Sequence, residues 1–286
     1  MQEAETKRSK PGGRFVAVFL AMTASAWAGP TIAQTPQQMN WCIGRDNATP
    51  DLQIKGCTAV IQTGPIAGSN LAKAYYNRGI AYAGEGQYDS AIADYSEVIR
   101  LSSKNANAFY DRGSAYAKKR QYDQAIADYD RAIQLDPKNA FTYVGRGNAY
   151  LSKDQYDLAI ADYTQALRLD PANADYLSNR CLARAIDGRE LARALADCNA
   201  SLRLQPNDGS TLNNRGLVQF KRGAFARAIA DYDAALKRDP KDAISLYGRG
   251  IAKLKSDDIA GGNADVAGAK AVRADVADVY ADYGVK

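Results

Sequence analysis

One pattern of amino acids recurs along this chain about every 34 residues. The segment NRGIAYAGEGQYDSAIADYSEVIRLSS at 77–103 returns as DRGSAYAKKRQYDQAIADYDRAIQLDP at 111–137 and as GRGNAYLSKDQYDLAIADYTQALRLDP at 145–171. Looser copies begin at residues 179 and 214, and a degenerate sixth begins at residue 248. A period of this length indicates a supersecondary unit stacked on copies of itself, because one unit alone cannot bury its apolar face.

Each unit contains two helical patterns. In AIADYDRAI at 125–133 the apolar residues fall at i, i+1, i+4, i+7 and i+8, which is one stripe of an amphipathic helix. The preceding segment places Phe109, Gly113 and Tyr116 on a similar stripe. Glycine costs a helix about 1 kcal/mol, so its recurrence at this position predicts two backbones that approach closely. Asp-Pro ends several units, because proline cannot continue a helix.

The spacing of the repeated residues resembles a known family. Tyr143-x2-Arg146-Gly147-x2-Tyr150, then Ala159-x3-Tyr163, then Pro171 is similar to the tetratricopeptide repeat, and the resemblance covers about residues 72–286. Arginine stands where the family often has leucine, a variant common in bacterial members. The resemblance implies an all-α fold, a right-handed α-solenoid of antiparallel helix pairs with capping helices at both ends, acting as a non-enzymatic scaffold.

The repeat divides the chain into segments. We expect a signal peptide at 1–33 and a degenerate repeat at 34–71 that caps the first end of the array. Five units follow over 72–242, and a degenerate sixth repeat with a C-terminal capping helix follows over 243–286. The five units are 72–105, 106–139, 140–173, 174–208 and 209–242.

The first 33 residues are typical of an export signal. Lys7, Arg8, Lys10 and Arg14 precede the apolar stretch 15–28, which is too short to span a bilayer comfortably. Small residues offer cleavage after residue 28 or after residue 33, and we favour the second, which leaves Gln34 first. The alternative is an uncleaved anchor. We therefore expect a periplasmic or secreted protein with no stable membrane insertion after cleavage.

Composition narrows the possible functions. The 37 basic and 32 acidic residues are interleaved, whereas nucleic-acid-binding proteins usually cluster their positive charge, so no nucleic-acid partner is expected. The chain has no histidine, which removes the commonest general base and metal ligand. We predict no catalytic residue, no metal site and no cofactor.

Four cysteines depart from the pattern. Cys181 replaces the repeated glycine and Cys198 replaces the repeated tyrosine within one unit, on helices expected to face each other. Cys42 and Cys57 fall near the equivalent places in the first, degenerate unit. Four cysteines permit three pairings, and this recurrence in an exported chain favours disulfides 42–57 and 181–198. The alternative is four small buried thiols.

Charged residues and tyrosines also recur in register. The arginines at 78, 112, 146, 180, 215 and 249 and the aspartates at 94, 128, 162, 197 and 231 form a ladder. At 100° per residue each arginine points away from the expected concave face, so we predict that the arginines tie helices together and bind no ligand. The repeated tyrosines fall on core stripes, which predicts packing with hydroxyls at the rim.

The resemblance implies which residues line the concave groove: those two positions before and two after each arginine. A protein or peptide partner is therefore expected to bind there, and the alternative functions are envelope polysaccharide binding or a role in export or assembly. Part of this lining could instead pack between repeats. The predicted groove residues from these positions are Tyr76, Ile80, Tyr110, Ser114, Val144, Asn148, Leu182, Asn213, Leu217, Tyr247 and Ile251, and Leu151 is predicted with them.

Overall fold

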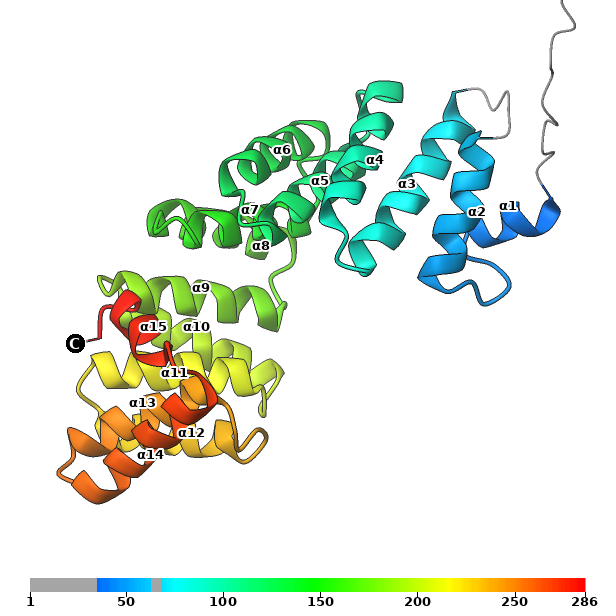
Figure 1. The fold of residues 1–286 in the computed structure, drawn as a ribbon. Coiled ribbons are helices and arrows are strands. Elements are labelled where there is room, and N and C mark those ends of the chain that lie inside the picture. Colours follow the sequence, from blue (N-terminus) through cyan, green and yellow to red (C-terminus); the bar gives the residue numbers. More distant parts are fainter. Residues whose placement is uncertain (1–34, 63–67, 286) are drawn as a thin grey trace, which may run out of the picture.

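A computed structural model describes residues 35–62 and 68–285, and the expected signal peptide lies outside these ranges. The described chain is an α-solenoid with no strands (Figure 1). Its helices are α1 (Pro36–Cys42), α2 (Pro50–Gln62), α3 (Ser69–Gly84), α4 (Tyr88–Leu101), α5 (Ala106–Lys118), α6 (Tyr122–Leu135), α7 (Ala140–Leu151), α8 (Tyr156–Leu169), α9 (Ala174–Asp187), α10 (Leu191–Leu204), α11 (Gly209–Lys221), α12 (Phe225–Leu236), α13 (Ala243–Leu254), α14 (Ile259–Val272) and α15 (Val276–Asp282).

Consecutive helices pack in pairs, and each pair packs on the next. Figure 1 shows the pairs following one another along a curved path from α1 to α14. The first helices of successive pairs also contact each other directly, as α3 does with α5, α5 with α7, α9 with α11 and α11 with α13. Helices that approach across a repeat boundary lie on the shorter, inner side of a curve. The odd-numbered helices therefore form the inner face of the array.

Short side chains and tight turns set the helix ends. Asn105, Asn139 and Asn173 accept hydrogen bonds from backbone N–H groups in the first turns of α5, α7 and α9, and Asp208 and Asp242 do the same at α11 and α13. In the six pairs from α3 to α14, one residue between the two helices adopts a left-handed backbone. These residues are Gly86, Arg120, Asp154, Gly188, Gly223 and Asp257. The unit ends its first helix by the same backbone turn six times.

A glycine and a tyrosine close the helix pair in most units. A Cβ atom placed on Gly147 would come within 2.9 Å of the Tyr163 ring, and one on Gly113 within 3.1 Å of the Tyr129 ring. Both tyrosines are almost fully buried. The glycine leaves room for a tyrosine ring from the second helix, and at Gly113 the backbones also approach closely as expected, since the same Cβ would lie 3.2 Å from the carbonyl oxygen of Ala125.

The first end of the array is a helix pair of its own. Helices α1 and α2 pack on each other and on α3, with Cys42, Cys57 and Val60 buried in one cluster with Ala74. No helix within 35–62 and 68–285 is long and apolar enough to cross a membrane.

The last helix does not lie where the sequence predicted it. It was expected to cover the second end of the array, but α13 and α14 form a full helix pair there, and α15 folds back across the array (Figure 1). Val276 packs with Ala243 of α13 and Ala269 of α14. Tyr280 joins a cluster that includes Cys181 of α9 and Leu217 of α11. Helix α15 therefore lies on the inner face.

Candidate functional site

The arginine ladder holds the scaffold together. Arg112 donates two hydrogen bonds of 2.8 Å to the carboxylate of Asp128 in its own helix pair and a third, of 2.9 Å, to Ser96 of the preceding pair. Each repeated arginine makes the same set of contacts. The carboxylate partners are Asp94, Asp128, Asp162, Asp197, Asp231 and Asp265, and the partners in the preceding pair are Thr58, Ser96, Asp130, Thr164, Asn199 and Asp233.

These ion pairs are largely buried. The side chain of Arg146 is 20% exposed and that of Asp162 is 7% exposed, so the pair is largely shielded from water and differs from an exposed surface pair. Hydrogen bonds to the carboxylates raise the pKa of Arg112 and Arg146 above the ordinary arginine value, although burial opposes this. Nε, Nη1 and Nη2 of Arg112 and Arg146 all donate to groups on neighbouring helices, so these arginines join helices as expected.

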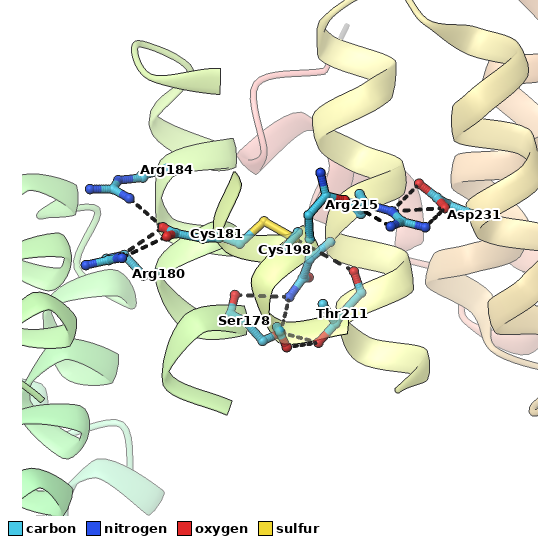
Figure 2. Close-up of a disulfide and its surroundings, with 12 residues drawn as sticks. Ser178, Arg180, Cys181, Arg184, Cys198, Thr211, Arg215 and Asp231 are labelled. Carbon is cyan, nitrogen blue, oxygen red and sulfur yellow. Dashed lines mark hydrogen bonds and ion pairs between the residues drawn. A yellow bond between two sulfur atoms is a disulfide. The ribbon is translucent and has the colours of Figure 1, made fainter. Parts of the chain in front are cut away.

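The four cysteines stand in the two expected pairs. The Cα atoms of Cys42 and Cys57 are 4.4 Å apart, those of Cys181 and Cys198 are 5.5 Å apart, and each pair is bonded through sulfur. Cys181 and Cys198 link α9 to α10 at the glycine and tyrosine positions of the other units (Figure 2). The two substitutions thus act together to close one helix pair.

The disulfide of the fourth unit lies between two polar groups (Figure 2). On one side, Arg180 and Arg184 both bind the carboxylate of Asp197. On the other, the buried hydroxyl of Thr211 donates to Ser178 over 2.8 Å and lies 3.1 Å from that of Ser201. These bonds fix the packing of α9, α10 and α11, so this junction is a structural one.

Between α3 and α8 the inner face is open to solvent. Tyr110, Ser114, Val144 and Asn148, all predicted groove residues, line one pocket of about 360 Å³ between α5 and α7. Ile80 is 44% exposed on α3. Tyr76 lines a second pocket, and its hydroxyl donates a 2.6 Å hydrogen bond to Asp111. The structure therefore gathers the first half of the predicted groove around pockets on one face.

From α9 to α13 the inner face is covered by the chain itself. Leu182, Leu217, Tyr247 and Ile251 were expected to line the groove, but they pack in the cluster that contains Tyr280 of α15. Leu217 is only 2% exposed. This part of the predicted groove is occupied by the last helix.

The two remaining predicted groove residues do not line the open pocket. Leu151 packs with Ala159, Tyr163 and Ala183 between units and so belongs to the core. Asn213 lines a polar pocket with Arg238 and is 3.5 Å from the carboxylate of Asp242.

Several residues of the open pocket were missed, and three of them matter for what it can bind. Phe141, which is 63% exposed, Lys118 and Gly145 all line it together with the predicted residues. Gly145 carried a signal in the sequence, because the triplet Gly-Arg-Gly occurs at 145–147 and again at 248–250, where other units have Asn or Asp before the arginine. Phe141 could not be found this way, because the residues at its position in other units, such as Lys73 and Asp175, share no side-chain type with it.

The described part of the chain offers no group of three metal-ligating side chains, and the chain has no histidine.

The strongest shifts in pKa belong to core tyrosines such as Tyr232 and Tyr280, whose phenol pKa is raised by burial. Such shifts follow from packing. The inner face is thus a surface of tyrosine, aliphatic and amide groups suited to holding another chain.

An α-solenoid of stacked helix pairs with an open inner face defines the class of repeat scaffolds. Comparison with known families identifies the type of repeat. Tetratricopeptide repeat profiles match residues 106–139, 140–173 and 181–247, and a TPR repeat profile matches residues 81–119. These matches span more than half of the sequence, so the chain belongs to the tetratricopeptide repeat family.

Solved structures share the fold. A tetratricopeptide repeat protein from Parabacteroides merdae is 18% identical, with a TM-score of 0.69 over 86% of this chain and 97% of that one. PilF of Pseudomonas aeruginosa is 19% identical, with a TM-score of 0.60 over 71% of this chain and 92% of that one. YrrB, described as a TPR protein with an unusual peptide-binding site, is 22% identical, with a TM-score of 0.50 over 63% and 93%. No curated protein sequence matches the chain significantly.

Proposed function

We propose that this protein is an exported, non-enzymatic scaffold that binds a segment of a partner protein on the inner face of α3, α5 and α7. The observation that carries the proposal is the open pocket between α5 and α7, where predicted groove residues converge while the rest of the inner face is covered. A concave, mostly apolar surface with a few polar groups is what peptide recognition by side-chain pockets requires.

The cysteines support the exported location. Disulfides form and persist mainly in oxidising surroundings, such as the bacterial periplasm or the outside of the cell, and this chain has two. The basic and apolar order of residues 7–28 agrees with export. The similarity to YrrB, whose description names a peptide-binding site, fits a peptide ligand for the same fold.

The exposed aromatic of the pocket provides the test. Phe141→Arg places a charge on the open face at a side chain that is already 63% exposed, so the fold should survive. Leu158→Arg makes the same kind of change at a side chain of α8 that is 48% exposed and lies outside the pocket. Immobilised mature protein is incubated with envelope extract, and captured proteins are identified by quantitative mass spectrometry.

We expect a protein that is captured by the wild type and by Leu158→Arg, and at least tenfold less by Phe141→Arg, with equal thermal midpoints for all three. Capture that is the same for Phe141→Arg would remove the groove assignment. Retention of envelope polysaccharide in place of protein, lost with Phe141→Arg, would favour the alternative function of polysaccharide binding.

A further inference from the structure

The size of the side chain before each repeated arginine determines how much space is left between that inner helix and the preceding one. Asn77 donates a 3.0 Å hydrogen bond to the carbonyl of Cys42, and Asn214 donates a 3.1 Å bond to the hydroxyl of Ser178. Asp111 accepts from the hydroxyl of Tyr76. In these units, the side chain at this position reaches back to the preceding inner helix and fills the gap between the two.

Two units have glycine at this position, and there the gap contains no such side chain. They are Gly145 of α7 and Gly248 of α13. A Cβ atom on Gly145 would come within 2.8 Å of the ring of Tyr129, and one on Gly248 would overlap the ring of Tyr232. Tyr129 and Tyr232 hold the same place in their own units. The two glycines therefore create the same slot beside the same buried tyrosine.

The slot at Gly248 is filled by the chain's own last helix. The hydroxyl of Tyr280 lies against Gly248, donates a 3.0 Å hydrogen bond to the carbonyl of Ile244, and lies 3.3 Å from the hydroxyl of Tyr232. The ring of Tyr280 packs against that of Tyr247, with centroids 5.0 Å apart. Tyr280 is 1% exposed, so the slot encloses a whole tyrosine side chain.

The slot at Gly145 is the open pocket. Its lining residues Phe141 and Val144 occupy the repeat positions that Ile244 and Tyr247 occupy beside Tyr280, and Lys118 occupies that of Lys221, which lies near Gly284. Its volume of about 360 Å³ accommodates an aromatic side chain. The same backbone therefore presents two copies of one site three units apart, one filled and one empty.

The filled copy shows the chemistry of what fits. Helix α15 is short, carries Asp278 and Asp282 beside Tyr280, and continues to Gly284, which lies next to the ammonium of Lys221. The ammonium of Lys221 donates to the carbonyls of Ala185 and Ile186, and Lys118 stands at the equivalent repeat position on the rim of the open copy. What the filled copy shows to fit is an aromatic side chain that projects from a short helix.

We propose that the pocket at Gly145 binds a tyrosine or phenylalanine side chain projecting from a short helix of the partner, as the slot at Gly248 binds Tyr280. This inference deepens the proposed function and rests on it. The aromatic ring lies beside Tyr129 and Val144, and a tyrosine hydroxyl donates to the carbonyl of Phe141. Partner recognition thus reuses the contact by which the chain holds its own last helix.

The probe is a synthetic, N-acetylated peptide with the sequence of residues 274–285, ADVADVYADYGV, added to the full mature chain. One analogue replaces the tyrosine by alanine (Tyr280→Ala in the peptide), and a second carries a benzophenone photo-crosslinker there. Gly145→Asn puts a Cβ within 2.8 Å of the Tyr129 ring and so closes the slot. Asp111 and Asn179 stand at this position after units that carry Tyr95 and Tyr163, so the repeat accommodates such a side chain, and an unchanged thermal midpoint is required of the variant. Gly84→Asn is the matched control, because a Cβ at Gly84 meets open space.

We expect the crosslinks to map to residues 106–152, and affinity to fall at least tenfold for the alanine analogue and for Gly145→Asn but not for Gly84→Asn. Crosslinks confined to residues 209–255 would mean exchange with the chain's own helix and would overturn the proposal. Undetectable binding, or binding indifferent to both the tyrosine and Gly145, would overturn it too. If Phe141→Arg still abolishes partner capture in those cases, the scaffold function stands and only the aromatic anchor is wrong.

Discussion

Cys198 stands in α10 where Tyr163 stands in α8, and each closes its own helix pair against the first helix. Tyr163 does so by laying its ring on Gly147, and Cys198 does so by a covalent bond to Cys181. Packing and a disulfide are thus alternative solutions at one position of the repeat. The exchange leaves the fourth unit dependent on its redox state.

Reduction of the disulfides should weaken the fourth and first units. Because the bond between Cys181 and Cys198 closes a loop of 17 residues, its loss should cost about 3 kcal/mol of unfolding free energy. Repeats contact only their neighbours, so the effect should be local. Hydrogen exchange with and without reductant should show faster exchange in α1, α2, α9 and α10 and little change in α5 to α8.

A double substitution provides the control for that experiment. Cys181→Gly with Cys198→Tyr restores the pair used by the neighbouring units, so this variant should fold and its α9 and α10 should no longer respond to reductant. Uniform acceleration of exchange across all helices, or four free thiols in protein isolated from an oxidising compartment, would contradict the local role.

Removing the aromatic anchor of the last helix should release that helix. Tyr280→Ala deletes a buried ring and should cost about 3–5 kcal/mol locally. Tyr280→Phe loses only the hydroxyl contacts with Ile244 and Tyr232, worth about 1 kcal/mol. Hydrogen exchange of α15 should rise strongly in the first variant and slightly in the second. If α15 were held mainly by Val276, hydrogen exchange of α15 would not rise more in Tyr280→Ala than in Tyr280→Phe.

Breaking one rung of the ladder should be more damaging than a surface pair would suggest. Arg146→Ala leaves the buried carboxylate of Asp162 without its cation, and we expect a loss of about 3 kcal/mol. Arg146→Met combined with Asp162→Leu removes both charges, so it should recover most of that loss. Urea unfolding of the single and double variants measures the difference. A single variant as stable as the wild type would show that water reaches the pair.

The repeat predicted most of the fold because it encodes local rules several times. The 34-residue period, the helical stripes and the arginine register located the stacked pairs, and the paired departures at Cys181 and Cys198 located the disulfides. Each of these signals acts within one unit or between neighbours. A sequence pattern can express such contacts directly.

The path of the last helix could not be predicted in the same way. The spacing of Val276, Val279, Tyr280 and Tyr283 indicates an apolar face but not which surface covers it, and the end of the array and its inner face are both apolar. What decides is the slot at Gly248, which admits the Tyr280 side chain. The sequence therefore predicted four groove residues that α15 covers in the structure: Leu182, Leu217, Tyr247 and Ile251.

The turn between α5 and α6 offers a simple gain in stability. Arg120 has a left-handed backbone, with φ of 60°, at the position where Gly86 and Gly223 stand in other units. Since a left-handed backbone costs a residue with a Cβ about 1 kcal/mol, Arg120→Gly should raise the unfolding free energy by up to that amount. The reciprocal change, Gly223→Arg, meets no neighbouring atom and should lower it similarly. Thermal midpoints that move in the same direction for both variants would disprove the backbone explanation.

The hydrogen bond between Tyr76 and Asp111 should make stability depend on pH. Burial raises the pKa of Asp111 above its ordinary value, and the bond from Tyr76 only partly opposes this. A raised pKa means that the folded state disfavours the ionised carboxyl. The stabilisation is therefore complete below the ordinary aspartate pKa and is lost as the pH rises through the folded value.

Asp111→Asn removes this titration while keeping an oxygen that accepts the hydrogen bond from Tyr76. The variant should therefore gain stability relative to the wild type as the pH rises from about 3 to 7, with the largest change just above the ordinary aspartate pKa. Urea midpoints of both proteins across this pH range measure the difference in their stability. All other titrating groups affect both proteins equally, so their contributions cancel in that difference. Parallel profiles would show that Asp111 titrates normally and that its carboxylate is well solvated between α3 and α5.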